Sequence, residues 1–152
     1  MELTYTLRFF TDKEHTTIDN ILNDERGWAS LGYNFVYVKS TESPYIIFEK
    51  RSNTYINTKF SHRPELAGLS VTVRTPQCST IYINARNWVA PPKSFDGTRT
   101  TYRQYVIQHE LGHALGYIHT TPSTKDTKCP VMYQQTRGTR GICKSNPWVS
   151  EQ

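Results

Sequence analysis

The feature that most constrains this chain is the stretch from His109 to His119, which reads HELGHALGYIH. His109 and His113 are four residues apart, and on a helix that spacing places one imidazole a single turn above the other. His119 lies too far along to reach the same point from one straight helix. The chain must bend before it, and Gly116 can take the left-handed conformation that such a bend requires.

Three imidazoles that converge on one point are a metal-binding arrangement. Neutral imidazole binds Zn²⁺ at about 2.0–2.1 Å, and three protein ligands leave a fourth tetrahedral position for water. We therefore predict one Zn²⁺ per chain, bound by His109, His113 and His119. A buried helix with ordinary histidines is the structural alternative, but the full pattern is expected by chance in on the order of one such chain in a hundred thousand.

Glu110 follows the first of these histidines, close to a water on the metal but badly placed to bind the metal itself. We expect it to act as a general base that takes a proton while the water attacks a carbonyl carbon. The same carboxyl group can then pass the proton to the departing amine. Gly112 also fits this interpretation, because a glycine inside a helix costs about 1 kcal/mol and needs a reason such as close packing near the metal.

The hydrophobic pattern predicts an α+β chain with a long helix from about Thr100 to Tyr117. Its apolar side should pack under a sheet and consists of Ile107, Leu111, Ala114 and Ile118. An earlier helix is expected from about Lys13 to Arg26, capped by Thr11 or Asp12 and ended by Gly27. Strands are predicted at Leu3 to Phe10, Asn34 to Lys39, Tyr45 to Lys50, Gly68 to Arg74 and Ser79 to Arg86. The chain after the long helix is expected to be irregular.

Size and composition indicate one globular domain, residues 1–152, which we expect to be a monomer. Hydrophobic residues make up 36% of the chain and charged residues 20%. The net charge is +5, but the basic residues are scattered and no nucleic-acid-binding motif accompanies them, so no nucleic-acid partner is expected. No apolar run is long enough for a membrane span, and Met1 to Thr11 lacks the pattern of a signal peptide.

The three cysteines, Cys78, Cys129 and Cys143, leave at least one thiol unpaired in a monomer. A disulfide between Cys129 and Cys143 would close a loop in an oxidising compartment, and the sequence leaves open whether it forms. Cys78 has no obvious partner and is interpreted as a buried structural thiol. His15 and His62 stand in polar surroundings and are predicted to be surface residues.

The long motif resembles that of the metzincin zinc metallopeptidases. In those proteins a methionine-containing turn lies beneath the metal, and Met132 is well placed to be that residue. The resemblance implies a zincin-like fold with a twisted mixed sheet above the metal-binding helix, and an edge strand that binds the peptide substrate. We assign Ser79 to Arg86 to that edge. Tryptophans are more often core or lid residues than substrate contacts, and Trp88, next to this strand, is the one candidate for the cleft. Tyr133 directly follows the methionine, one place earlier than the metal-proximal tyrosine of astacin-like members, and is a candidate oxyanion donor.

A closer resemblance covers nearly the whole chain. It is to an uncharacterised metzincin-like domain family of secreted or envelope-anchored actinobacterial proteins. Besides the metal-binding helix, it is carried by Arg26–Trp28, Ile83–Asn84, Tyr102–Tyr105, Pro130–Met132, Gln134–Thr136 and Asn146–Trp148. The resemblance implies an extracytoplasmic location and a peptidase fold, with no established substrate.

These observations favour a zinc-dependent endopeptidase that acts on a peptide or protein substrate. The alternative is a zinc-stabilised binding or structural domain that keeps the metzincin fold without useful catalysis. The intact Glu110 argues against that alternative. Cleavage preference, activation and oligomeric state are not determined by the linear order of residues.

Overall fold

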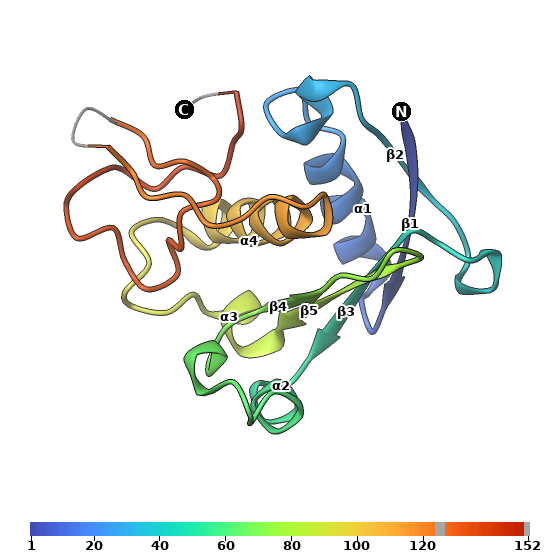
Figure 1. Ribbon diagram of the computed structural model, residues 1–152, viewed down its shortest axis with the longest axis horizontal. Helices are drawn as coiled ribbons and strands as arrows, with labels where there is room; N and C mark the ends of the chain where they lie inside the picture. The colour runs from blue at the N-terminus through green and yellow to red at the C-terminus, as the bar shows by residue number, and fades with distance from the viewer. Residues whose placement is uncertain (124–126, 151–152) are drawn as a thin grey trace.

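The computed structural model describes residues 1–123 and 127–150, which form a mixed sheet with helices on both faces (Figure 1). The sheet has five strands in the order β2-β1-β3-β5-β4. They are β1 (Glu2–Arg8), β2 (Asn34–Tyr37), β3 (Ile46–Arg51), β4 (Val71–Val73) and β5 (Ser79–Asn84). β1, β2, β3 and β5 are parallel to one another, and β4 runs antiparallel to β5.

The edge of the sheet beside the long helix is β4, so the assignment of Ser79 to Arg86 to that edge is wrong. β5 lies between β3 and β4 and pairs with both. Its side chains agree with an inner position: Ile81 and Ile83 are buried in the main core, while Tyr82 points to the other face. A strand covered on both faces needs such a nearly continuous apolar run. β4 has only three residues and therefore a much weaker signal.

The first helix, α1 (Asp12–Leu22), begins at Thr11, which forms a capping box with Glu14. It ends four residues earlier than predicted, with Asn23 rather than Gly27 following its last turn. The Asn23 side chain accepts a hydrogen bond from the backbone of Phe35 at 3.1 Å and donates one back at 3.1 Å, which ties the helix end to β2. Gly27 has a different role, because a Cβ there would overlap the side chain of Gln108.

The long helix, α4 (Arg99–Ala114), is capped by Thr98 and packs against α1, β4 and β5. Ile107, Leu111 and Ala114 are fully buried, as the apolar pattern predicted. Ile118 is 81% exposed because the helix stops before it. The core therefore lies between the sheet and the pair α1 and α4.

Short helices occupy segments for which no helix was predicted. They are α2 (Asn53–Lys59), α3 (Ala85–Val89) and the 3-10 turns η1 (Trp28–Leu31), η2 (Ser40–Glu42) and η3 (Pro64–Leu66). α2 covers the face of β5 that carries Tyr82. Trp88 in α3 is only 1% exposed, packed on the ring of Phe10 and under the guanidinium of Arg103. Of the two roles considered for Trp88, packing in the core is therefore the one observed, and the cleft role is not.

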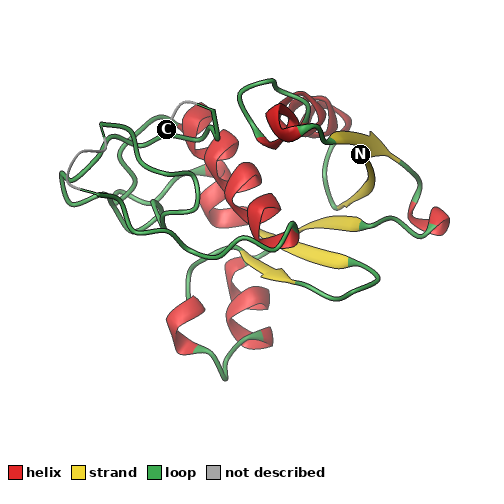
Figure 2. Cartoon of the chain, turned by 45° about the horizontal axis from the view of Figure 1, so that its top comes forward, coloured by secondary structure: helices red, strands yellow, loops and turns green. Residues whose placement is uncertain are grey.

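The described residues after Ala114 contain no helix and no strand, only an isolated bridge between Lys128 and Lys144, as expected (Figure 2). A disulfide joins Cys129 to Cys143 within this part of the chain. None of the helices in the described ranges has the length and apolar character that a membrane crossing requires.

Candidate metal centre

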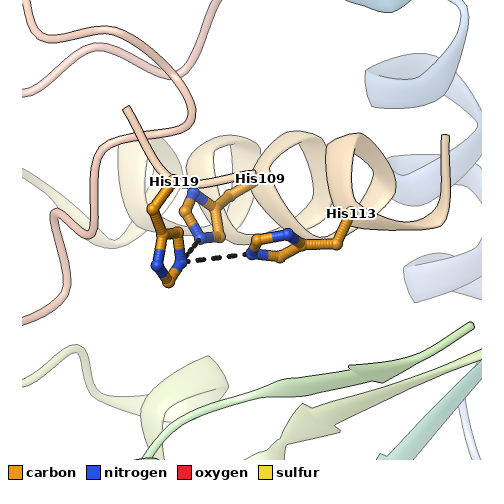
Figure 3. A group of neighbouring side chains, drawn as sticks. All are labelled: His109, His113 and His119. Carbon is orange, nitrogen blue, oxygen red and sulfur yellow. Dashed lines mark hydrogen bonds between the residues drawn. The ribbon is translucent and has the colours of Figure 1, made fainter. Parts of the chain in front are cut away.

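The three predicted metal ligands meet on the side of α4 that faces the edge of the sheet (Figure 3). The Nε2 atom of His119 lies 3.3 Å from Nε2 of His109 and 3.2 Å from Nε2 of His113. One ligand atom from each histidine lies within 4.8 Å of the others. A tetrahedral site with Zn–N bonds of about 2.0–2.1 Å has ligand atoms about 3.3–3.4 Å apart, so the spacing fits such a site.

Hydrogen bonds at the far side of two rings determine which nitrogen carries the proton. Nδ1 of His109 lies 2.7 Å from the carbonyl oxygen of Val131, and Nδ1 of His113 lies 2.9 Å from that of Tyr117. A carbonyl oxygen can only accept, so each Nδ1 must donate. Each Nε2 then presents a lone pair toward the common centre, the arrangement that metal-binding histidines use.

Burial keeps these imidazoles neutral. It lowers the pKa of His109 to about 3, and it also lowers the pKa values of His113 and His119. The lone pairs of His109 and His113 point toward one centre beside Nε2 of His119, and they repel one another unless a cation lies between them. The donor set therefore fits a divalent metal ion with nitrogen ligands.

The bend that brings His119 back to the helix occurs at Gly116, whose φ is +100°. The amide of Tyr117 donates to the carbonyl of Gly112 at 2.9 Å, and the amide of Gly116 donates to that of His113 at 3.0 Å. This pair of bonds is the Schellman pattern, which requires a left-handed residue at this position. Gly116 thus lies at the end of the helix in the left-handed conformation that the sequence predicted.

Glu110 lies next to the histidines with its side chain buried. The hydroxyl of Thr72 on β4 donates to its Oε2 at 2.6 Å. Burial raises the pKa of Glu110 to about 8, an effect that the Thr72 bond partly opposes. A carboxyl group in this setting binds a proton far more readily than an exposed glutamate does.

The turn that carries Met132 passes directly under α4. A Cβ on Gly112 would overlap the sulfur of Met132 and would lie 2.7 Å from the indole of Trp28. The close contact therefore explains the glycine inside the helix. The backbone amide of Thr120, next to His119, donates to the carbonyl of Met132 at 3.0 Å and connects the bend to this turn.

A cavity of about 690 Å³ opens beside the histidines, between α4, β4 and the loop that contains η3. Glu110, His113 and His119 lie in its wall. Gln134 also lines it, whereas Tyr133 is absent from the lining; the carbonyl of Tyr133 accepts from the hydroxyl of Tyr105 at 3.2 Å. Neither Gln134 nor Thr72 was among the predicted site residues, because no local motif marks either of them.

The remaining predictions about histidine and cysteine have mixed outcomes. His62 is exposed on the rim of the cavity, and His15 is half-buried against the ring of Tyr37. Cys78 is unpaired and half-buried rather than fully buried. Burial raises the pKa of its thiol, which disfavours the reactive thiolate form.

Comparison with known proteins supports the fold. A family model described as "Protein of unknown function (DUF3152)" matches residues 7–147. No curated protein matches the chain. The solved structure of myroilysin is similar, with 19% sequence identity and a TM-score of 0.50, over 78% of this chain and 49% of that one. The chain thus spans about half the length of myroilysin. The predicted fold class, α+β of the zincin or metzincin-like type with a mixed sheet, is confirmed.

Proposed function

The chain belongs to the family described as "Protein of unknown function (DUF3152)", and we propose that it is a zinc-dependent endopeptidase. The observation that carries the proposal is the convergence of three neutral imidazoles beside a buried carboxyl group in the wall of a cavity. Three nitrogen ligands leave one tetrahedral position for another group, and a site that keeps an open position is typical of catalytic rather than structural zinc.

In this proposal His109, His113 and His119 bind the metal. Zn²⁺ held there would supply Lewis acidity toward a water molecule and toward the carbonyl oxygen of the scissile bond. Met132 would be the methionine of a metzincin-type turn. Its packing against Gly112 would hold that turn under α4. The carbonyl of Val131, the residue before Met132, would then stay in place to accept the hydrogen bond from Nδ1 of His109.

Glu110 would move the proton. Thr72 engages Oε2, which orients the carboxyl group and leaves Oε1 to accept a proton from the attacking water. Once it has taken that proton, the same carboxyl group can deliver it to the departing amine. Thr72 would then be a positioning residue that connects the edge strand to the catalytic carboxyl group.

The substrate would bind along β4. This strand pairs with β5 on one side, and in the described ranges no strand pairs with its other side. An extended peptide can add there through backbone hydrogen bonds, which give affinity without demanding a particular side-chain sequence. A peptide in this place would pass over the histidines, because β4 also packs against α4.

Two side chains compete for the role of oxyanion donor. Tyr133, predicted from the sequence, stays a hypothesis and is not among the residues that line the cavity. Gln134 is the stronger candidate: its Oε1 accepts from the Tyr105 hydroxyl and the Thr136 amide, both at 3.3 Å, which leaves its amide protons to donate. We expect Gln134→Ala to lower kcat by about 10²-fold and Tyr133→Phe to leave it nearly unchanged.

The setting in which the protein acts is also a proposal. The disulfide between Cys129 and Cys143 favours an oxidising compartment outside the cytoplasm, as the family resemblance implied. Peptides or proteins would be its partners, and we propose that it acts as a monomer. That it does not bind nucleic acid stays a prediction.

The decisive experiment measures metal content and cleavage in the same samples. Protein purified without added metal should contain one zinc per chain by elemental analysis, and His113→Ala should lose it. Glu110→Ala should keep zinc and fold but lose cleavage of a broad peptide library. Equal zinc in the wild type and His113→Ala would refute the metal site. Retained zinc without cleavage in the wild type would favour the alternative, a zinc-stabilised binding domain.

A further inference from the structure

One guanidinium lies within the cavity near the metal ligands without a role in the proposed chemistry. Arg74 directly follows β4 and lines the cavity together with His113 and His119. Its side chain lies over the bend at Gly116: a Cβ added to that glycine would come within 3.1 Å of Nη2 and 3.2 Å of Cζ. The glycine that turns the chain toward His119 therefore also gives this guanidinium room beside the metal ligands.

The other charged groups of the cavity have protein partners. The guanidinium of Arg63 pairs with Glu65 at 2.5 Å, and Nη2 of Arg137 donates to the carbonyl of Glu65 at 2.6 Å. Glu110 accepts from Thr72. Within residues 1–123 and 127–150, no hydrogen bond or ion pair engages Arg74. Of the three guanidinium groups that line the cavity, that of Arg74 is thus the one without a hydrogen-bond or ion-pair partner among the described residues.

A free guanidinium in a cleft is suited to one kind of ligand group. Its planar set of N–H donors matches the two oxygens of a carboxylate, and it stays charged at any physiological pH. β4 ends at Val73, so a peptide paired along β4 would bring a residue near the scissile bond to Arg74. The lining of the cavity is otherwise poor in charges that would repel an anion, since Glu65 is paired and Glu110 lies on the α4 side.

We propose that Arg74 is a specificity-determining residue, which selects substrates with a carboxylate close to the scissile bond. This inference rests on the proposed function, because it assigns the substrate class of the same site. The carboxylate can belong to a glutamate or aspartate side chain or to the C-terminus of the substrate. Both sources offer the same pair of oxygens, and the experiment separates them.

The test uses peptide pairs that differ in one group: glutamate against glutamine at each position around the cleaved bond, and a free against an amidated C-terminus. Cleavage by the zinc-loaded protein gives kcat/KM, and binding to Glu110→Ala gives affinity without turnover. We expect one pair to differ by about tenfold or more in favour of the carboxylate. The pair that differs identifies the source of the carboxylate.

Variants then assign the preference to Arg74. Arg74→Ala should reduce the difference within that pair to about twofold or less, and Arg74→Glu should favour lysine over glutamate at the same position. Arg99→Ala is the matched control: Arg99 is exposed on the first turn of α4, outside the cavity lining, and its loss should leave the preference intact.

The outcomes separate this inference from the peptidase proposal. If no peptide is cleaved but binding still prefers the carboxylate and Arg74→Ala removes that preference, the peptidase proposal fails and the role of Arg74 stands. If neither cleavage nor binding distinguishes the members of any pair, the inference is overturned. It is also overturned if Arg74→Ala discriminates as strongly as the wild type.

Discussion

The two parts of the chain that enclose the metal site are held together in different ways. Residues 1–114 contain every helix and strand found in the described residues, and their stability is distributed over a sheet and a large apolar core. The described residues after Ala114 have neither helix nor strand, yet they provide His119, Met132 and Gln134. An irregular segment can therefore hold a site in place when a few side chains form the hydrogen bonds that backbone groups make to one another in helices and strands.

Two buried amide side chains, those of Gln135 and Asn146, provide several such hydrogen bonds. The Nε2 atom of Gln135 donates to the carbonyls of Pro130 and Asn146, at 3.0 and 2.8 Å. The Nδ2 atom of Asn146 donates to the carbonyls of Cys129 and Trp148, at 3.0 and 2.9 Å, and its Oδ1 accepts from the Trp148 amide. These bonds satisfy backbone groups that a strand or helix would otherwise pair. Single substitutions should therefore have larger effects here than in the first part of the chain.

The largest effect is expected from Asn146→Ala. It leaves two carbonyls and one amide of the backbone buried without partners, and we expect a loss of roughly 3–5 kcal/mol in the free energy of unfolding. Guanidinium denaturation followed by circular dichroism measures it. Asn20→Ala, at an exposed position in α1, is the control and should change stability by no more than about 0.5 kcal/mol. A cost below about 1 kcal/mol for Asn146→Ala would contradict the assigned role of the amide pair.

A smaller effect is expected from opening the disulfide. Cys129 and Cys143 are separated by 14 positions, and a crosslink that closes a loop of this length stabilises a fold by about 3 kcal/mol through the unfolded state. The double variant Cys129→Ser/Cys143→Ser should lose that amount. Reductant should lower the free energy of unfolding of the wild type by the same amount and should leave that of the double variant unchanged. A wild type insensitive to reductant would show that the crosslink does not support the segment.

The smallest effect is expected in the regular part of the chain. Thr11→Ala removes the hydroxyl that accepts from the Glu14 amide at the start of α1. The loss of such a cap costs about 1 kcal/mol, because the rest of the helix remains packed in the core. Thr11→Ser keeps the acceptor and should retain most of the stability. If Thr11→Ala cost as much as Asn146→Ala, the proposed contrast between the two parts would be wrong.

Local spacing was sufficient to predict much of the fold and the convergence of His109, His113 and His119. The period of α4 and the four-residue spacing of His109 and His113 both depend on helix geometry alone. Gly116 was also predictable, because few residues adopt a positive φ at low cost. The end of α1 was misplaced because Asn23 binds the backbone of β2, a contact between segments that no local pattern contains.

Residues whose roles depend on distant segments were not predictable in the same way. Strand order placed β4 rather than β5 at the edge, and so brought Thr72 to Glu110 and Arg74 to the bend at Gly116. Nothing in the residues around Gln134 or Trp88 indicates that one lines the cavity and the other fills the core. The sequence by itself determined the helix and bend that bring three histidines together, because they lie within eleven consecutive residues governed by backbone geometry. Tertiary structure alone decided what surrounds that helix, because strand pairing and packing join segments that the chain separates by tens of residues.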